Sequence, residues 1–432
     1  MTLSGLALAY ARRRPLATAL VVALAAIGIG IATLTLLVSH ELEGRMTRDA
    51  RGIDLVVGAK GSPLQLVLAG VYHADVPPGN VPYASLARLR ANPKVASAIP
   101  LALGDSVRGF RIVGTEPALV EHYGASLAEG AMFDAPMQAV IGSEAARATG
   151  LRVGASFAGT HGLAEGGGEH EAEPYRVVGV LAPTGSVVDR LVLTPVESVW
   201  DVHETHRAPP RPTPGVALAN GNGRGKGGDG SPTPPAGAGG QPGGHAADAD
   251  ADRELTMILV RYASPIAAAS LPREINQSSA LVAASPAYET ARLFTVFGVG
   301  LDLVRAFAAI LVGASVLLLF VALAQALEER RYDLAILRAL GARRRDLVRV
   351  LVVESVALAA AGAVIGLALG HAAAATIGWW LPAAAPLAGA AARPVAAEGV
   401  VVGLALAGGI LAACWPAWRA SRLDVAATLA DA

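Results

Sequence analysis

Histidines and their acidic neighbours are the first side chains in this 432-residue sequence that could do chemistry. Five of the nine histidines fall between His161 and His245, in polar stretches such as "DVHETH". Imidazole and carboxylate groups are ligands for zinc, so His203 and His206, with Glu204 between them, are candidate metal ligands. The spacing of a closed three- or four-ligand site is missing, however, and solvated loops also collect these residue types. Both interpretations stay open.

A glycine-rich stretch, "NGNGRGKGG", has the look of a phosphate-binding loop. Such a loop needs a glycine five residues before the Gly-Lys pair and Ser or Thr after the lysine, but Asn220 and Gly227 occupy these positions. The stretch lies in 207–252, whose Gly, Pro, Asn, Ala and Asp cannot bury enough apolar surface to fold. We therefore predict a disordered linker there, no nucleotide site in this chain, and no catalytic residue.

Glu354 is a single acidic residue in an otherwise apolar run. Ionisable groups within a membrane are often functional, so a catalytic or proton-carrying role is one interpretation. Glu354 lies within about a turn of the start of the run, where its carboxylate could reach water or Arg349. This position favours a role in packing.

The composition indicates a membrane protein. Charged residues make up 16% of the chain, against about 25% in soluble domains. Four apolar stretches approach the ~20 residues that span a bilayer: 16–39, 304–327, 350–370 and 400–417. The first is too long for the core of a cleaved signal peptide, so we predict an uncleaved anchor. A formal net charge of zero argues against a nucleic-acid partner, and a single cysteine excludes an intrachain disulfide.

Arginines predict the orientation of these spans, because short cytoplasmic segments are rich in Lys and Arg. Three arginines precede the first span, seven lie in 328–349 and two lie in 418–432, whereas 371–399 holds only Arg393. We therefore expect both tails (1–15 and 418–432) and the 328–349 loop in the cytoplasm. The segments 40–303 and 371–399 are then external.

The long external segment has an α+β pattern. We predict strands within 53–61, 175–181, 190–195 and 255–262, helices within 82–93 and 266–276, and a strand, helix, glycine stop and strand over 138–157. The stretch 94–116 reads as a hairpin that turns at Gly104 and Asp105. Helical stalks are expected after Ser39 and over 285–305.

The loop 328–349 contains a short amphipathic helix, "RYDLAILRALGA". Leu334 and Leu337 are three residues apart, Ile336 and Leu340 are four apart, and Gly341 is a natural helix stop. A signal that only keeps the loop in the cytoplasm would need nothing more than arginines. A short amphipathic helix with a defined end suggests instead a docking element for a partner. A helix that lies in the lipid headgroups is the alternative.

Two motifs carry a resemblance to a known family. The stretch "ERRYDLAILRALGARRRDLVRVLVVES", then Gly362, Gly366 and Gly370, then "PAWRASRLDVAATL", resembles the C-terminal module of MacB/FtsX-type ABC permeases. The matching residues are Asp333, Leu334, Leu337, Arg338, Ala339, Gly341 and Ala342, followed by Pro416, Arg419 and Ala420. Tyr332 and Val425 depart from the family pattern. The stretch 139–157 is similar to the family's external domain.

The resemblance implies four transmembrane helices with an α+β extracytoplasmic domain, like the periplasmic core of MacB, between spans 1 and 2. It also implies an inner-membrane permease whose 328–349 loop couples it to a separate ATPase. The implied coupling residues are Asp333, Leu334, Ile336, Leu337, Arg338, Leu340 and Gly341. ATP and Mg²⁺ would be bound by that ATPase, and this chain would hold no cofactor.

Further implications concern packing and partners. Gly362, Gly366 and Gly370, with Glu354, would serve helix packing, either within one chain or at a seam between two permease chains. ATP-driven motion would pass through the stalks to the external domain by mechanotransmission. It would export or extract a periplasmic or lipoprotein-type substrate.

Two other functions remain as alternatives. The chain could be a non-transporting regulator that uses the same ATPase to activate an envelope enzyme. It could also be an intramembrane enzyme that depends on Glu354.

Overall fold

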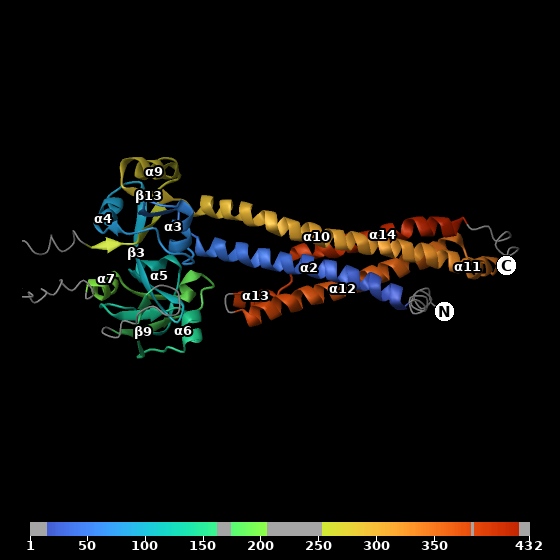
Figure 1. Cartoon of the computed structure of the whole chain (residues 1–432), viewed down its shortest axis with the longest axis horizontal. Coiled ribbons are helices and arrows are strands. Elements are labelled where there is room, and N and C mark those ends of the chain that lie inside the picture. Colours follow the sequence, from blue (N-terminus) through green and yellow to red (C-terminus); the bar gives the residue numbers. More distant parts are fainter. Residues whose placement is uncertain (1–14, 162–173, 205–252, 382–383, 423–432) are drawn as a thin grey trace, which may run out of the picture. The chain divides into compact units, whose positions relative to one another are not determined.

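The computed structural model describes residues 15–161, 174–204, 253–381 and 384–422 (Figure 1). These form two compact units, one of residues 1–45 with 292–432 and one of residues 46–291. The predicted linker 207–252, His206 and most of the two predicted tails lie outside the described residues.

The first unit is helical. Its helices are α2 (Pro15–Asp49), α10 (Pro286–Glu329), α11 (Arg331–Ala339), α12 (Arg344–Trp380), α13 (Ala385–Ala390) and α14 (Ala396–Ser421), of which α2 and α10 continue into the second unit. Among the described residues, α2, α10, α12 and α14 are long and apolar enough to cross a membrane. The helices α2 and α10 have 35 and 44 residues, well beyond the roughly 20 that a bilayer needs.

Small residues bring the spans together. The Ser355 hydroxyl of α12 donates to the Gly409 carbonyl of α14, and a Cβ on Gly409 would lie 2.8 Å from that of Ala359. Next to this contact, Leu319 and Leu323 of α10 share an apolar cluster with residues of α12 and α14. Close contact between apolar helices is the main stabilising term where lipid is as apolar as the side chains.

The second unit is built on a mixed sheet. Its strands are β1 (Leu55–Ala59), β2 (Val81–Pro82), β3 (Val95–Val107), β4 (Phe110–Thr115), β5 (Leu127–Gly130), β6 (Gln138–Ile141), β7 (Ser156–Phe157), β8 (Thr160–His161), β9 (Tyr175–Leu181), β10 (Leu191–Pro195), β11 (Glu254–Leu255), β12 (Met257–Tyr262) and β13 (Leu281–Ala284). The main order is β13-β1-β12-β3-β4-β10-β6-β9-β5, while β7 pairs with β9, β8 with β3 and β11 with β2. The pairs β4–β10 and β6–β9 are parallel and the others antiparallel.

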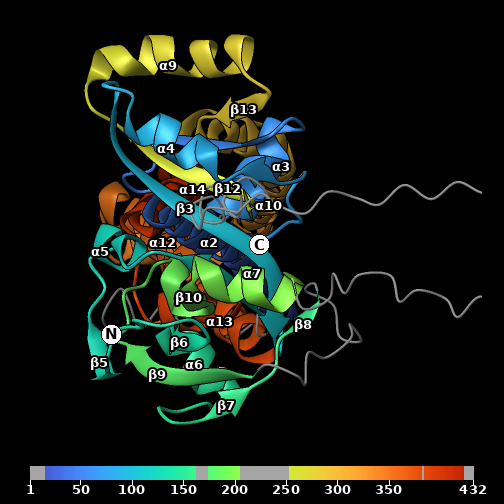
Figure 2. The ribbon, with the colours of Figure 1, turned by 90° about the vertical axis from the view of Figure 1, so that its left-hand side faces the viewer.

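Helices cover both faces of this sheet, which explains why its central strands are apolar throughout. The helices are α3 (Pro63–Gly70), α4 (Ala84–Arg90), α5 (Ala118–His122), α6 (Ser143–Thr149), α7 (Val196–Glu204) and α9 (Pro265–Ser278). Val56 packs with α3 and α5, whereas its neighbours Leu55 and Val57 pack with α4, α7 and α9. Figure 2 shows these helices around the strands of the unit. Four apolar spans with an α+β domain were predicted, and this fold class is confirmed.

The predicted hairpin forms, but its predicted turn is wrong. β3 runs on to Val107, and the turn is made by Arg108 (φ 49°) and Gly109 (φ 83°). Two residues with positive φ form the tight turn that matches the twist of paired strands. Gly104 and Asp105 instead lie inside β3, where the register shifts between Leu103 and Ser106. A bulge and a turn favour the same residue types, so the sequence pattern did not separate them.

Candidate functional site

The helix α11 links two spans through short breaks. It follows α10 after Arg330, whose backbone leaves helical geometry (φ −98°, ψ 5°). It ends at Ala339, and the chain turns two residues later at Gly341, whose φ of 102° is accessible to glycine at little cost. The Asp346 carboxylate then accepts a bond from the Arg343 amide at 3.1 Å and caps the start of α12.

One face of α11 is anchored in the helical unit. Leu334 is 7% exposed and shares an apolar cluster with Leu327 of α10 and with Leu347 and Leu351 of α12. Leu334 was predicted as one of the coupling residues, and its side chain lies inside the unit rather than on the surface. The Leu334 side chain holds α11 against its neighbours.

The other face of α11 presents an apolar row to the surface. Tyr332, Ile336 and Leu340 follow one another at four-residue spacing and are 49%, 38% and 80% exposed. Four residues is close to one helical turn, so the three lie along one side of the helix. We call these three residues the α11 stripe.

The remaining predicted coupling residues surround this stripe. Arg338 is half-buried in the last turn, and Gly341 follows the end of the helix. Asp333 and Leu337 lie on α11 by their backbone, but their side chains fall outside those described. At the start of the helix, Glu328 pairs with Arg331 at 3.2 Å and with Arg419 of α14 at 2.8 Å.

Glu354 lies in the part of α12 that packs near the end of α10. Its partner there is Arg330 rather than Arg349. Its carboxylate accepts a bond from Arg330 at 3.2 Å, and both side chains are largely buried. Arg349, the partner suggested by the sequence, instead lies 3.8 Å from Asp346. Arg330 is 24 residues away in sequence, and only the return of the chain after α11 brings it to Glu354. The pair joins the end of α10 to the start of α12.

The three spaced glycines form a seam inside the chain. A Cβ on Gly362, Gly366 or Gly370 would lie 2.6 to 2.8 Å from the Cβ of Ala25, Ile29 or Thr33 of α2, respectively. The sequence left open whether these glycines face another helix of the same chain or a second chain. The structure places them against α2 of the same chain, where no larger residue fits without displacement.

At its far end, α12 is held to α14 and to the segment before it. The His371 ring lies 3.2 Å from the Glu398 carboxylate, and its other nitrogen lies 2.8 Å from the Ala391 carbonyl oxygen. Beyond it, Trp379 and Trp380 are exposed at the end of α12.

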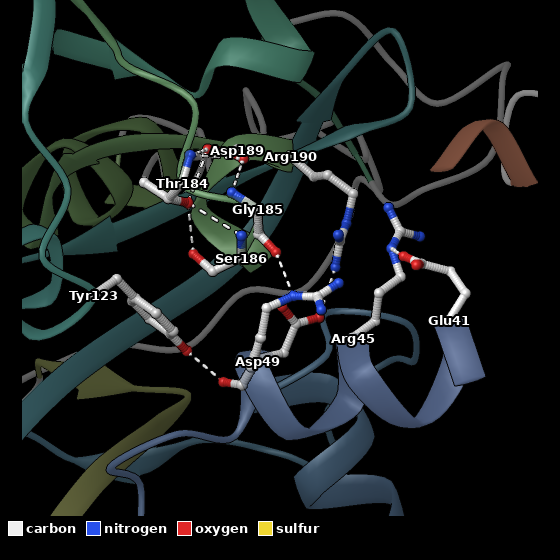
Figure 3. A network of polar contacts seen from close by, with 10 residues as sticks. Glu41, Arg45, Asp49, Tyr123, Thr184, Gly185, Ser186, Asp189 and Arg190 are labelled. Carbon is white, nitrogen blue, oxygen red and sulfur yellow. Dashed lines mark hydrogen bonds and ion pairs between the residues drawn. The ribbon is translucent and has the colours of Figure 1, made fainter. Parts of the chain in front are cut away.

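In the second unit, the end of α2 is tied to the loop before β10 (Figure 3). The Asp49 carboxylate accepts a bond from Arg190 at 2.9 Å, and Arg48 donates to the Gly185 carbonyl at 3.1 Å. The Tyr123 hydroxyl donates to the Asp49 carbonyl at 2.8 Å. We call these five residues the stalk clamp. Burial raises the pKa of the Tyr123 hydroxyl, which therefore remains a donor.

The loop that the stalk clamp holds is itself rigid. The Asp189 carboxylate accepts bonds from the Thr184 amide at 3.0 Å, the Gly185 amide at 2.7 Å and the Thr184 hydroxyl at 2.9 Å (Figure 3). A displacement of the last turn of α2 would therefore move this loop as one piece. Sequence analysis missed the stalk clamp because Asp49 and Arg190 are 141 residues apart and neither belongs to a motif.

The metal candidates lie at the edge of the described residues. His203 lies in the last turn of α7, and His206 lies outside the described residues. Within the part of the chain that the structure describes, no three His, Cys, Asp or Glu side chains come together to hold a metal.

Comparison with known proteins gives a family. Residues 18–219 match the model of the MacB-like periplasmic core domain, and residues 305–425 match the model of the FtsX-like permease C-terminal region. No curated protein matches the chain.

Two solved structures are similar to part of the chain. The periplasmic region of MacB from Actinobacillus actinomycetemcomitans is 12% identical, with a TM-score of 0.32, over 56% of this chain and 95% of that one. The extracellular domain of the noncanonic ABC-type transporter YknZ from Gram-positive bacteria is 11% identical, with a TM-score of 0.29, over 54% and 98%. From the two family models, this chain belongs to the MacB/FtsX-type ABC transporter permeases, as a multi-pass membrane protein with a periplasmic domain.

Proposed function

We propose that this permease couples ATP hydrolysis by a separate cytoplasmic ATPase to conformational change in its periplasmic domain. The α11 stripe is the observation that carries this proposal. A helix with one face anchored by Leu334 and an exposed apolar row on another suits insertion into a partner's groove. The arginines near it, such as Arg331 and Arg338, would orient a partner with an acidic rim.

The ATPase would supply all of the nucleotide chemistry. The family implies a partner ATPase, and the sequence of this chain has no phosphate-binding loop. ATP and Mg²⁺ would therefore be bound by the partner. The role of this chain would be mechanical.

The proposed orientation has both termini and α11 in the cytoplasm and residues 46–291 in the periplasm. The arginine-rich segments at 12–14, 328–349 and 419–422 support it. Exposed tryptophans mark both ends of the spans, with Trp379 and Trp380 at the end of α12 and Trp415 and Trp418 near the end of α14. Tryptophan is enriched at membrane interfaces, and the family's periplasmic domain supports a location in the inner membrane.

Mechanical coupling would begin where α10, α11 and α12 follow one another. A partner that moved α11 would act on α10 and α12 through Leu334 and the Arg330–Glu354 pair. The helix α10 has 44 residues, about 66 Å at the usual rise, and continues without interruption to Pro286. The helix α2 continues to Asp49 and the stalk clamp. These two helices are the stalks through which motion would reach the periplasmic domain.

The assembly would contain two permease chains and two ATPase subunits, as the resemblance implies. Its work would be export or extraction of a periplasmic or lipoprotein-type substrate. A regulator of an envelope enzyme would use the same motion. It would be recognised by loss of that enzyme's activity, without accumulated cargo, when the permease is deleted.

Co-purification tests the docking claim. A tagged chain is expressed in its native host, and the ATPase that co-purifies in mild detergent is identified and quantified. We expect a stoichiometric ATPase that is lost when Ile336 and Leu340 are both replaced by Asp. Ile266→Asp, at an isoleucine of α9 that is 80% exposed like Leu340, is the matched control and should retain the ATPase. Retention by the α11 variant, at unchanged expression, would contradict docking at the α11 stripe.

A further inference from the structure

A hollow lies between the start of α12 and the end of α14. It has a volume of ≈ 440 Å³ and is lined by Arg344, Arg345, Val348, Arg349 and Ser421. Arg344 and Arg345 are the first two residues of α12, and Ser421 is the last residue of α14. These residues are separate from the α11 stripe.

The hollow is strongly basic. Its three arginines are exposed, and the nearby Asp346 offsets only part of their charge, 3.8 Å from Arg349. Within the described part of the chain, no ion pair involves Arg344 or Arg345. The Ser421 hydroxyl already donates to the Trp418 carbonyl at 2.7 Å, so the donors that face the hollow are the guanidinium groups. Three guanidinium groups form a donor set suited to the oxygens of a phosphate.

Its neighbours place the hollow at the membrane surface. Trp415 and Trp418 precede Ser421 on α14 and are exposed. The guanidinium of Arg422 lies 4.3 Å from the Trp418 ring centre, and that of Arg419 lies 5.3 Å from the Trp415 ring centre. Indole rings favour the depth of lipid headgroups, so the adjoining arginines lie near the depth of the phosphates.

We propose that this hollow binds the phosphate of an anionic phospholipid. Basic pockets between spans on the cytoplasmic side recognise anionic headgroups. Val348 adds an apolar wall beside the charged groups, as suits a glycerol backbone next to a phosphate. A choline headgroup would bring a cation to three arginines, so phosphatidylcholine should bind less well. Free phosphate shares the recognised chemistry, and the experiment must separate the two sources. The site would act without the ATPase.

Quenching of Trp418 by brominated lipid tests the proposal. The full chain keeps Trp418 as its only tryptophan, with the other four replaced by Phe, and is placed in nanodiscs of phosphatidylcholine with a minor fraction of phosphatidylglycerol. Bromine is carried on the acyl chains of one lipid or the other, at equal amounts. A second variant that keeps only Trp379, at the opposite end of α12, reports lipid that is not held in the hollow.

We expect brominated phosphatidylglycerol to quench Trp418 more than brominated phosphatidylcholine, and to quench Trp379 no more than the latter. Arg344→Gln with Arg345→Gln should raise the phosphatidylglycerol needed for half-maximal quenching about tenfold. The matching double Lys variant, which keeps the charge, should raise it less.

Three results would overturn the proposal. Equal quenching of Trp418 by the two lipids would show that the hollow has no preference for an anionic headgroup. A preference that survives the double Gln variant would place the lipid elsewhere. A preference removed by inorganic phosphate, but not by chloride at the same ionic strength, would show that the hollow takes free phosphate. Circular dichroism of each variant shows that the comparison is made on folded protein.

Discussion

At the scale of single residues, the partner of Glu354 determines what that residue does. Glu354→Gln would break the largely buried ion pair between Glu354 and Arg330, whose side chains lie 3.2 Å apart. Breaking one side of a buried ion pair costs about 3 kcal/mol or more. We expect a clear fall in the thermal midpoint of the purified chain in detergent, with partial recovery when Arg330→Gln is added.

Glu328→Gln is the matched control for this change. Glu328 also pairs with arginines, but its side chain is exposed, and exposed pairs contribute at most about 1 kcal/mol. An unchanged midpoint for Glu354→Gln, with ATPase-independent chemistry lost, would instead support an intramembrane catalytic carboxylate.

His73 gives the periplasmic domain a pH dependence. Burial, reinforced by the charges of Arg111 and Arg190, lowers the pKa of His73 from 6.5 to about 3. In the unfolded chain the histidine takes up a proton below pH ~6.5, whereas the folded domain resists protonation down to about pH 3. Protonation of His73 therefore leaves the free energy of unfolding unchanged above pH ~6.5 and lowers it progressively as the pH falls from ~6.5 toward 3.

His73→Asn should remove this dependence. The φ of His73 is 52°, a conformation that asparagine tolerates better than most residues. We expect thermal midpoints measured from pH 7 to pH 4 to fall less steeply in the variant than in the unchanged chain. Parallel slopes would show that His73 does not control acid sensitivity.

At the scale of elements, the glycine seam joins α12 to α2. Gly366→Ala would place a Cβ 2.7 Å from that of Ile29 and 2.8 Å from the Ala26 carbonyl oxygen. Such overpacking costs about 1–3 kcal/mol, and we expect a lower thermal midpoint in detergent. Gly403→Ala is the control, because a Cβ there meets nothing within 4 Å and alanine favours a helix. Equal midpoints for the two variants would contradict close packing at the seam.

The stalk clamp can be measured by a double-mutant cycle. Asp49→Asn and Arg190→Gln, alone and combined, should show a coupling free energy of about 1–2 kcal/mol, because Asp49 is buried and Arg190 is partly exposed. The exposed Lys94–Glu274 pair, at 2.6 Å, is the control and should show no measurable coupling. Additive effects at Asp49 and Arg190 would mean that the contact does not hold the loop to α2.

The sequence patterns predicted where helices and strands lie in the chain better than they predicted the contacts between them. The apolar runs, the strand–helix–glycine–strand stretch that became β6, α6, Gly150 and β7, and the helix that stops before Gly341 are all local signals. The amphipathic pattern of α11 did not tell which row of leucines faces inward, since that depends on where α10, α12 and α14 pack. The stalk clamp depends on residues that only the folded chain brings together.

At the scale of the whole molecule, the proposed function makes the chain a mechanical path from α11 to the periplasmic domain. The α11 stripe would meet the partner. Leu334 and the Arg330–Glu354 pair hold α11 and its neighbours together, and α2 and α10 extend past the length that a bilayer needs. The sequence predicted the four spans because each is long and apolar. The orientation drawn from the arginines remains a prediction.

The central claim is that ATP binding by the partner changes the periplasmic domain, and hydrogen exchange of the reconstituted complex tests it most directly. Amide exchange over residues 46–291 is compared between nucleotide-free complex and complex trapped with ATP and vanadate. We predict changed protection in the last turn of α2 and in the Thr184–Arg190 loop, and loss of that change in the α11 double Asp variant. Identical exchange in the two nucleotide states, with the ATPase bound and active, would contradict mechanical coupling.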